Sequence, residues 1–225
     1  MAQTSNQMDV YLEIGQKRAF AGAIEWPGWC RSGRDEASAL QALIDYAPRY
    51  ARALRNTGLG FRAPAGTSAF SVIERLTGTG NTDFGALGAP PSSDARPVSA
   101  AELERFQSVL KACWQTFDSA VRAAGGKELR KGPRGGGRDV EDIVKHVLGA
   151  QAAYLSRMGL KLPPGAEDDP AQVKLATLQA LAMAPRDGVV TKGPRGGLHW
   201  TSRYFIRRVA WHVLDHAWEI EDRSE

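Results

Sequence analysis

The chain has 225 residues, of which 43% are hydrophobic and 24% are charged, an ordinary composition for a folded globular protein that excludes a wholly disordered or fibrous chain. The net charge is only +4, from 29 Lys and Arg against 25 Asp and Glu. Because the acidic residues are interspersed with the basic ones, we expect no nucleic-acid partner. No apolar run reaches the roughly 20 residues of a membrane-spanning helix, so we also expect no membrane association.

The first residues and the cysteine count predict the compartment. The chain begins Met-Ala-Gln-Thr-Ser-Asn-Gln, without a basic patch followed by an apolar stretch, so we expect no secretory signal. Cys30 and Cys113 are the two cysteines, too few for a disulfide framework or for an all-cysteine metal site. A reducing compartment fits this usage, and we expect a cytoplasmic protein.

Residues 1–84 predict a small α+β module of order β-β-α-β. Residues 9–14 and 18–25 have strand patterns, joined by a turn at residues 15–17. Residues 26–33 contain a proline and glycines and predict a loop. Apolar residues at helical spacing predict a helix over about residues 35–55, which Pro48 should kink or break. Residues 69–76 predict a third strand, with a short helix as the alternative.

Residues 85–98 are rich in Gly, Pro and Ser and lack periodicity, which predicts a linker. Beyond it, amphipathic patterns predict four helices, over about residues 99–124, 139–158, 169–184 and 201–222. Ser99 and Glu102 have the spacing of a capping box, and Asp169 followed by Pro170 is a typical helix start. Helices of this length with short connections predict a four-helix bundle over residues 99–225.

One six-residue segment, Lys-Gly-Pro-Arg-Gly-Gly, occurs at residues 131–136 and again at 192–197, before the second and the fourth predicted helix. Backbone amides at a helix N-terminus, aided by an arginine, can hold a carboxylate or another anion; the alternative is two turns with solvated charges. In an up-down-up-down bundle both segments would lie at one end, with Arg208 between them and the histidines. Arg134, Arg195 and Arg208 are therefore our candidate substrate-binding residues.

Three of the four histidines lie in predicted helices, His146 in the second and His212 and His216 in the fourth. Because His212 and His216 are four residues apart, their rings project from one helix face. With His146 from a neighbouring helix they could ligate one divalent metal ion and leave coordination positions open. The alternative is that these are partly buried histidines with hydrogen-bond partners. Zn²⁺ is the first candidate ion, and Ni²⁺, Mn²⁺ and Fe²⁺ also suit imidazole ligands.

Three carboxylates follow or precede these histidines by three or four residues: Asp142, Asp215 and Glu219. A carboxylate that accepts a hydrogen bond from the distal ring nitrogen orients a histidine ligand. The alternatives are that Asp142 is a first-turn residue favoured by the helix dipole, and that Asp215 and Glu219 pair with Arg208 or Arg223.

Two segments carry a resemblance to a known family: residues 144–154, which contain His146, and residues 211–218, which contain His212 and His216. With them, roughly residues 99–223 resemble the DinB-like family of four-helix bundles, which includes thiol-dependent S-transferases and mycothiol-dependent isomerases. The resemblance implies a divalent metal ion bound by these three histidines. It also implies the transfer of a small thiol to an electrophilic small molecule, with the metal favouring the nucleophilic thiolate.

Residues 10–14, 20–29 and 33–40 carry a second resemblance. With them, roughly residues 8–78 resemble HicB-like modules, which in toxin–antitoxin systems bind a small ribonuclease and usually carry a DNA-binding segment. We find no such segment in this chain. The second hypothesis for function is therefore a non-catalytic, metal-stabilised binding or regulatory protein whose HicB-like module recognises a protein partner. A homodimer stays open as the assembly.

Overall fold

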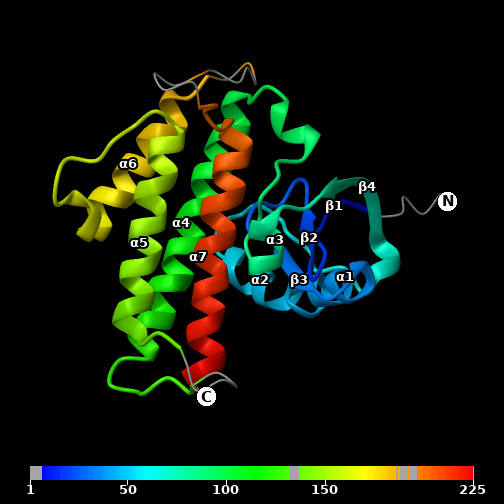
Figure 1. The fold of residues 1–225 in the computed structure, drawn as a ribbon, viewed down its shortest axis with the longest axis horizontal. Coiled ribbons are helices and arrows are strands. Elements are labelled where there is room, and N and C mark those ends of the chain that lie inside the picture. Colours follow the sequence, from blue (N-terminus) through cyan, green and yellow to red (C-terminus); the bar gives the residue numbers. More distant parts are fainter. Residues whose placement is uncertain (1–6, 132–136, 186, 188–191, 193–196, 225) are drawn as a thin grey trace. The chain divides into compact units, whose positions relative to one another are not determined.

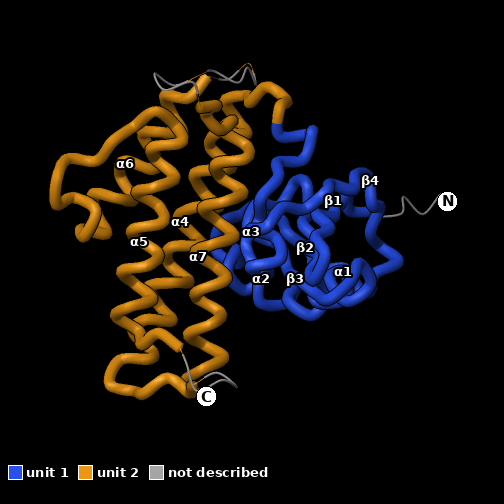
Figure 2. The backbone as a smooth tube through the Cα atoms, in the orientation of Figure 1, with its two compact units in different colours: residues 1–94 blue, residues 95–225 orange. Residues whose placement is uncertain are grey.

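A computed structural model describes residues 7–131, 137–185, 187, 192 and 197–224. The chain divides into two compact units, Met1–Asp94 and Ala95–Glu225 (Figure 2). A four-stranded sheet lies in the first unit and long helices form the second (Figure 1). The protein is therefore of the mixed α+β class, as the sequence predicts.

The sheet of the first unit has the order β3-β2-β1-β4. Its strands are β1 (Met8–Ile14), β2 (Ala19–Ala23), β3 (Cys30–Gly33) and β4 (Phe70–Thr77), and β1 is antiparallel to β2 but parallel to β4. The prediction of a loop over residues 26–33 is wrong for β3. Pro27 and Gly28 stay in the preceding turn, where Gly28 has a φ of 93°, and residues 30–33 are then free to pair with β2.

The predicted helix over residues 35–55 is divided into α1 (Glu36–Asp45) and α2 (Ala47–Leu54). Pro48 lies in the first turn of α2, where its missing N–H costs no hydrogen bond, so the predicted break is confirmed. The Nε1 of the buried Trp29 donates to the carbonyl of Leu43, and the Trp29 ring stacks on Tyr50 at 6.0 Å. These contacts join both helices to the segment that leads into β3.

The prediction of a linker over residues 85–98 is wrong for its first part, which packs within the first unit after α3 (Gly80–Phe84). The carboxylate of Glu13, fully buried on β1, accepts hydrogen bonds from the amides of Gly88 and Ala89, at 2.8 and 3.2 Å, and from the hydroxyl of Thr82. A buried carboxylate needs such donors. These hydrogen bonds hold Gly88 and Ala89 against β1.

The second unit contains α4 (Ala100–Ala123), α5 (Val140–Arg157), α6 (Pro170–Met183) and α7 (Ser202–Ser224), all within a few residues of the prediction. Ser99 and Glu102 form the predicted capping box of α4, and the side chain of Asp169 accepts from the first amides of α6. The four helices pack side by side (Figure 1). None of the helices in the described part of the chain combines the length and the hydropathy that a membrane crossing requires.

Helices α5 and α7 run antiparallel. At one end the amide of Trp200 donates to the carbonyl of Arg157 at 2.9 Å, and at the other end Arg223 Nη2 donates to the carbonyl of Arg138 at 2.8 Å. The premise of an up-down-up-down bundle is therefore wrong. Figure 1 shows why: the connection between α5 and α6 returns along the bundle before α6 begins.

This arrangement removes the basis for a clasp built from both Lys-Gly-Pro-Arg-Gly-Gly segments. The helices that follow the segments, α5 and α7, begin at opposite ends of the unit. Arg134 and Arg195 themselves lie outside the described residues.

Candidate metal centre

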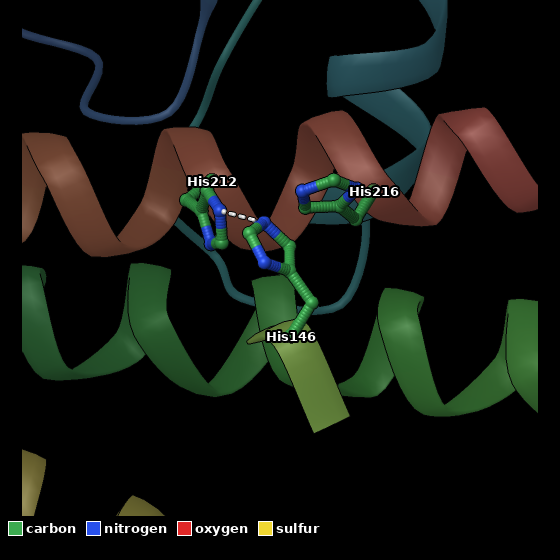
Figure 3. Close-up of side chains that lie close together, drawn as sticks. All are labelled: His146, His212 and His216. Carbon is green, nitrogen blue, oxygen red and sulfur yellow. Dashed lines mark hydrogen bonds between the residues drawn. The ribbon is translucent and has the colours of Figure 1, made fainter. Parts of the chain in front are cut away.

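The rings of His146 on α5 and of His212 and His216 on α7 point toward one another (Figure 3). The Nε2 atoms of His146 and His212 are 3.2 Å apart, and one nitrogen from each of the three rings lies within 4.8 Å of the others. The three histidines could thus hold a metal ion. We call this cluster the histidine triad.

Local sequence and helix packing together produce the triad. On α7 the four-residue spacing places both rings on the same side of the helix, with their centroids 4.6 Å apart. On α5 the side chain of Asp139 caps the helix, and Ile143 and Val147 are buried on the face that packs into the unit. His146 lies between these two apolar residues in sequence, and the antiparallel packing of α5 on α7 brings its ring against the pair.

The triad is buried on one side and open on the other. His212 and His216 are 7% and 8% exposed, whereas His146 is partly exposed. The triad therefore reaches solvent at His146 on α5, and the two rings of α7 form its buried side.

The environment of His212 and His146 favours the neutral form of these two rings. Burial lowers the pKa of His212 well below its ordinary value, and the charges of His216, His146 and Arg208 act in the same direction. Burial also lowers the pKa of His146, with a smaller contribution from His216. Because a metal ion binds the neutral imidazole, both shifts preserve the form that coordinates.

Glu219 makes the contact that its spacing predicts. Its carboxylate accepts a hydrogen bond from His216 Nδ1 at 2.7 Å and a second from Arg223 Nη1 at 2.7 Å. The hydrogen bond from His216 lowers the pKa of Glu219. With its Nδ1 occupied in this way, His216 presents Nε2 to the triad, as an outer carboxylate commonly arranges for a histidine ligand.

Asp142 and Asp215 do not orient the rings, and this prediction is wrong. Asp142 is exposed in the first turn of α5, where its amide donates to Asp139, and within the described chain the hydrogen bond of His146 goes to His212. The Nδ1 of His212 is buried without a hydrogen-bond partner among the described residues, so Asp215 does not accept from it. Asp142 has instead the position of a first-turn residue that the helix dipole favours.

Arg208 lies beside the triad, one helical turn before His212. It is 7% exposed, its Nη2 donates to the hydroxyl of Tyr154 at 3.0 Å, and its guanidinium carbon lies 5.9 and 5.1 Å from the ring centroids of Trp200 and Trp211. Sequence reasoning did not select Tyr154, whose ring meets that of His212 edge-on at 5.9 Å. The sequence could have indicated Tyr154, because it lies about two helical turns after His146 on the same helix.

The chain matches no protein-family model, no curated protein and no solved structure in the comparisons made.

We expect the stability of the metal-free protein to fall as the pH falls from 7 to 5. The unfolded histidine titrates near a pKa of about 6.5, whereas the pKa of folded His212 is lower. At pH values between these two pKa values the unfolded state binds more protons than the folded state. The free energy of unfolding therefore decreases as the pH falls, by up to about 1.4 kcal/mol per pH unit for one histidine. Urea unfolding with a chelator at several pH values measures this slope.

His212→Gln should flatten the slope, because it removes the group that is held neutral. His199→Gln is the matched control, since His199 lies outside the triad, and should keep the wild-type slope. Equal slopes in wild type and His212→Gln would contradict the prediction.

Proposed function

We propose that the protein is a divalent-metal-dependent transferase of the DinB-like type, which moves a low-molecular-weight thiol onto an electrophilic small molecule. The convergence of three imidazoles from two helices, with one side accessible to solvent, is the observation that carries the proposal. A structural zinc site is closed by four protein ligands, whereas a catalytic site keeps a position open for a substrate. Three protein ligands among the described residues, one of them partly exposed, match the second kind.

The spacing of two triad nitrogens fits a first-row divalent ion, and the nitrogen of His216 lies within 4.8 Å of both. With metal–nitrogen bonds near 2.0–2.1 Å, the ligand nitrogens of a tetrahedral ion lie about 3.3 Å apart, and the Nε2 atoms of His146 and His212 are 3.2 Å apart. All-imidazole donors suit Zn²⁺, Ni²⁺ or Fe²⁺, and Mn²⁺ less well. Zn²⁺ remains our first candidate, with His146, His212 and His216 as the ligands.

The surroundings of the triad suit a reaction of a thiolate. When bound, the cation would lower the pKa of a thiol and hold the nucleophilic thiolate at neutral pH. Glu219 orients His216, while the burial of His212 excludes water from the α7 side. The partly exposed His146 leaves the α5 side for the thiol and the electrophile to enter.

The test is turnover by the metal-loaded full chain. Protein reconstituted with Zn²⁺ or Ni²⁺ is incubated with glutathione, L-cysteine or coenzyme A, each with an aryl epoxide and with an alkyl halide, and the thioether is followed by mass spectrometry. We expect metal-dependent product, its loss in His146→Ala and its retention in His199→Ala. A metal-loaded chain that turns over no pair, yet binds one stoichiometric protein partner, would instead favour the hypothesis of a binding or regulatory protein.

A further inference from the structure

The hydroxyl oxygen of Tyr154 accepts a hydrogen bond, and its proton is available to donate another. Its oxygen accepts the hydrogen bond of Arg208 Nη2 at 3.0 Å. A guanidinium has only donors, so the phenolic proton must point away from Arg208. Within the described part of the chain that proton has no acceptor, since the other contacts of Tyr154 are with the rings of Trp200 and His212 and with the guanidinium of Arg208.

The ring of Tyr154 lies beside the triad, against that of His212. Tyr154 is partly exposed and lies on α5, the helix that also carries the partly exposed His146. Its ring contacts that of His212, with centroids 5.9 Å apart, and that of Trp200, with centroids 5.2 Å apart. The buried Arg208 on α7 donates to the hydroxyl oxygen. The two ring contacts and this charge-assisted hydrogen bond thus preorganise one hydrogen-bond donor beside the triad.

We propose that Tyr154 donates this hydrogen bond to an oxygen atom of the electrophile at the triad. The preferred substrates are electrophiles in which negative charge collects on oxygen as the sulfur attacks, an epoxide being the simplest. This inference rests on the proposed function and specifies its substrate class.

The chemical step with an epoxide balances without a further reactant. The sulfur–carbon bond forms while the carbon–oxygen bond breaks, and the electron pair of that bond goes to the oxygen. The oxygen takes the Tyr154 hydrogen bond as its charge grows and then a proton from water, while the proton of the thiol has gone to solvent. A preorganised donor aimed at developing charge is a strong catalytic device, and the Arg208 bond polarises the O–H further. A halide leaves as a solvated anion and gains little from this donor.

The first test uses binding, without turnover. The full chain is loaded with Co²⁺, and its visible absorption is titrated with acetate, whose oxygens accept hydrogen bonds, and with imidazole, whose outer nitrogen donates. Tyr154→Phe keeps the ring and should weaken acetate binding about tenfold to a hundredfold, while imidazole affinity changes less than about threefold. Tyr204→Phe, a neighbour whose ring lies 4.9 Å from Trp200, should leave both affinities unchanged. Unchanged acetate binding in Tyr154→Phe would overturn the inference.

The second test uses selectivity. With L-cysteine as the thiol, Tyr154→Phe should lower kcat/KM for an aryl epoxide by about a hundredfold, and that for an alkyl halide by less than about threefold. Equal losses with both electrophiles would mean a merely structural residue and would overturn the inference. The two proposals fail separately: a chain that takes up no Co²⁺ removes the transferase and with it the donor role. A chain that turns over both electrophiles with the same selectivity in wild type and Tyr154→Phe removes only the donor role.

Discussion

His212→Ala is expected to abolish stoichiometric metal binding, with a loss of affinity greater than about a hundredfold. Removal of an outer hydrogen-bond partner already costs about ten- to a hundredfold, and the removal of a ligand costs more. His212 is buried, its pKa is lowered well below the ordinary value by that burial, and its ring lies next to those of both other histidines. Elemental analysis of protein exposed to excess Zn²⁺ and then desalted, together with a competition titration, measures both quantities.

Graded variants make this result specific. His146→Ala and His216→Ala should behave like His212→Ala, whereas Glu219→Gln, which keeps the ligands but removes the charged partner of His216, should lose about ten- to a hundredfold in affinity. His199→Ala should retain one ion per chain. Full metal content in any of the three triad variants would refute the assignment of that residue as a ligand.

Metal binding should raise the stability of the second unit, which contains all three ligands. An ion that binds only the folded state stabilises it by about 2.7 kcal/mol when its free concentration is a hundredfold above Kd. For a domain of this size that corresponds to an increase in Tm of about 5–10 °C. The gain exists because α5 and α7 must pack together before the three nitrogens meet.

Differential scanning calorimetry of the full chain, with and without Zn²⁺, measures this shift, and a chelator should reverse it. His146→Ala is the matched variant: it removes the only triad ligand on α5, so the same Zn²⁺ concentration should leave its Tm unchanged. An equal Zn²⁺-dependent shift in wild type and His146→Ala would show that the ion stabilises the chain elsewhere.

The helices of the second unit were predictable because their signals are local. The Ser99–Glu102 capping box and the Asp169 cap satisfy backbone amides within the same turn. The break at Pro48 follows equally from the missing N–H and the clash of the ring with the preceding turn. In each case the residues that decide the structure are neighbours in sequence.

The predictions that the structure overturned depend instead on contacts between residues far apart in sequence. Strand β3 forms because β2 offers a partner for residues 30–33, and a hydrogen-bond ladder between strands leaves no signal in a four-residue segment. The segment after α3 is held by the buried carboxylate of Glu13, which is 75 and 76 residues away in sequence from Gly88 and Ala89. The directions of α5 and α7 depend on the path of the connection between α5 and α6.

For the site, the sequence by itself determined that His212 and His216 share a helix face, because the geometry of an α-helix puts side chains four residues apart on one side. It also offered the His216–Glu219 contact, which spans less than one turn, beside the alternative of a pair with Arg208 or Arg223, and the structure has Glu219 in contact with both His216 and Arg223. Only the tertiary structure decided that His146 joins the pair and that Arg208 holds Tyr154 beside His212. These contacts cross between α5 and α7, and their register is a property of the packed helices that neither helix carries alone.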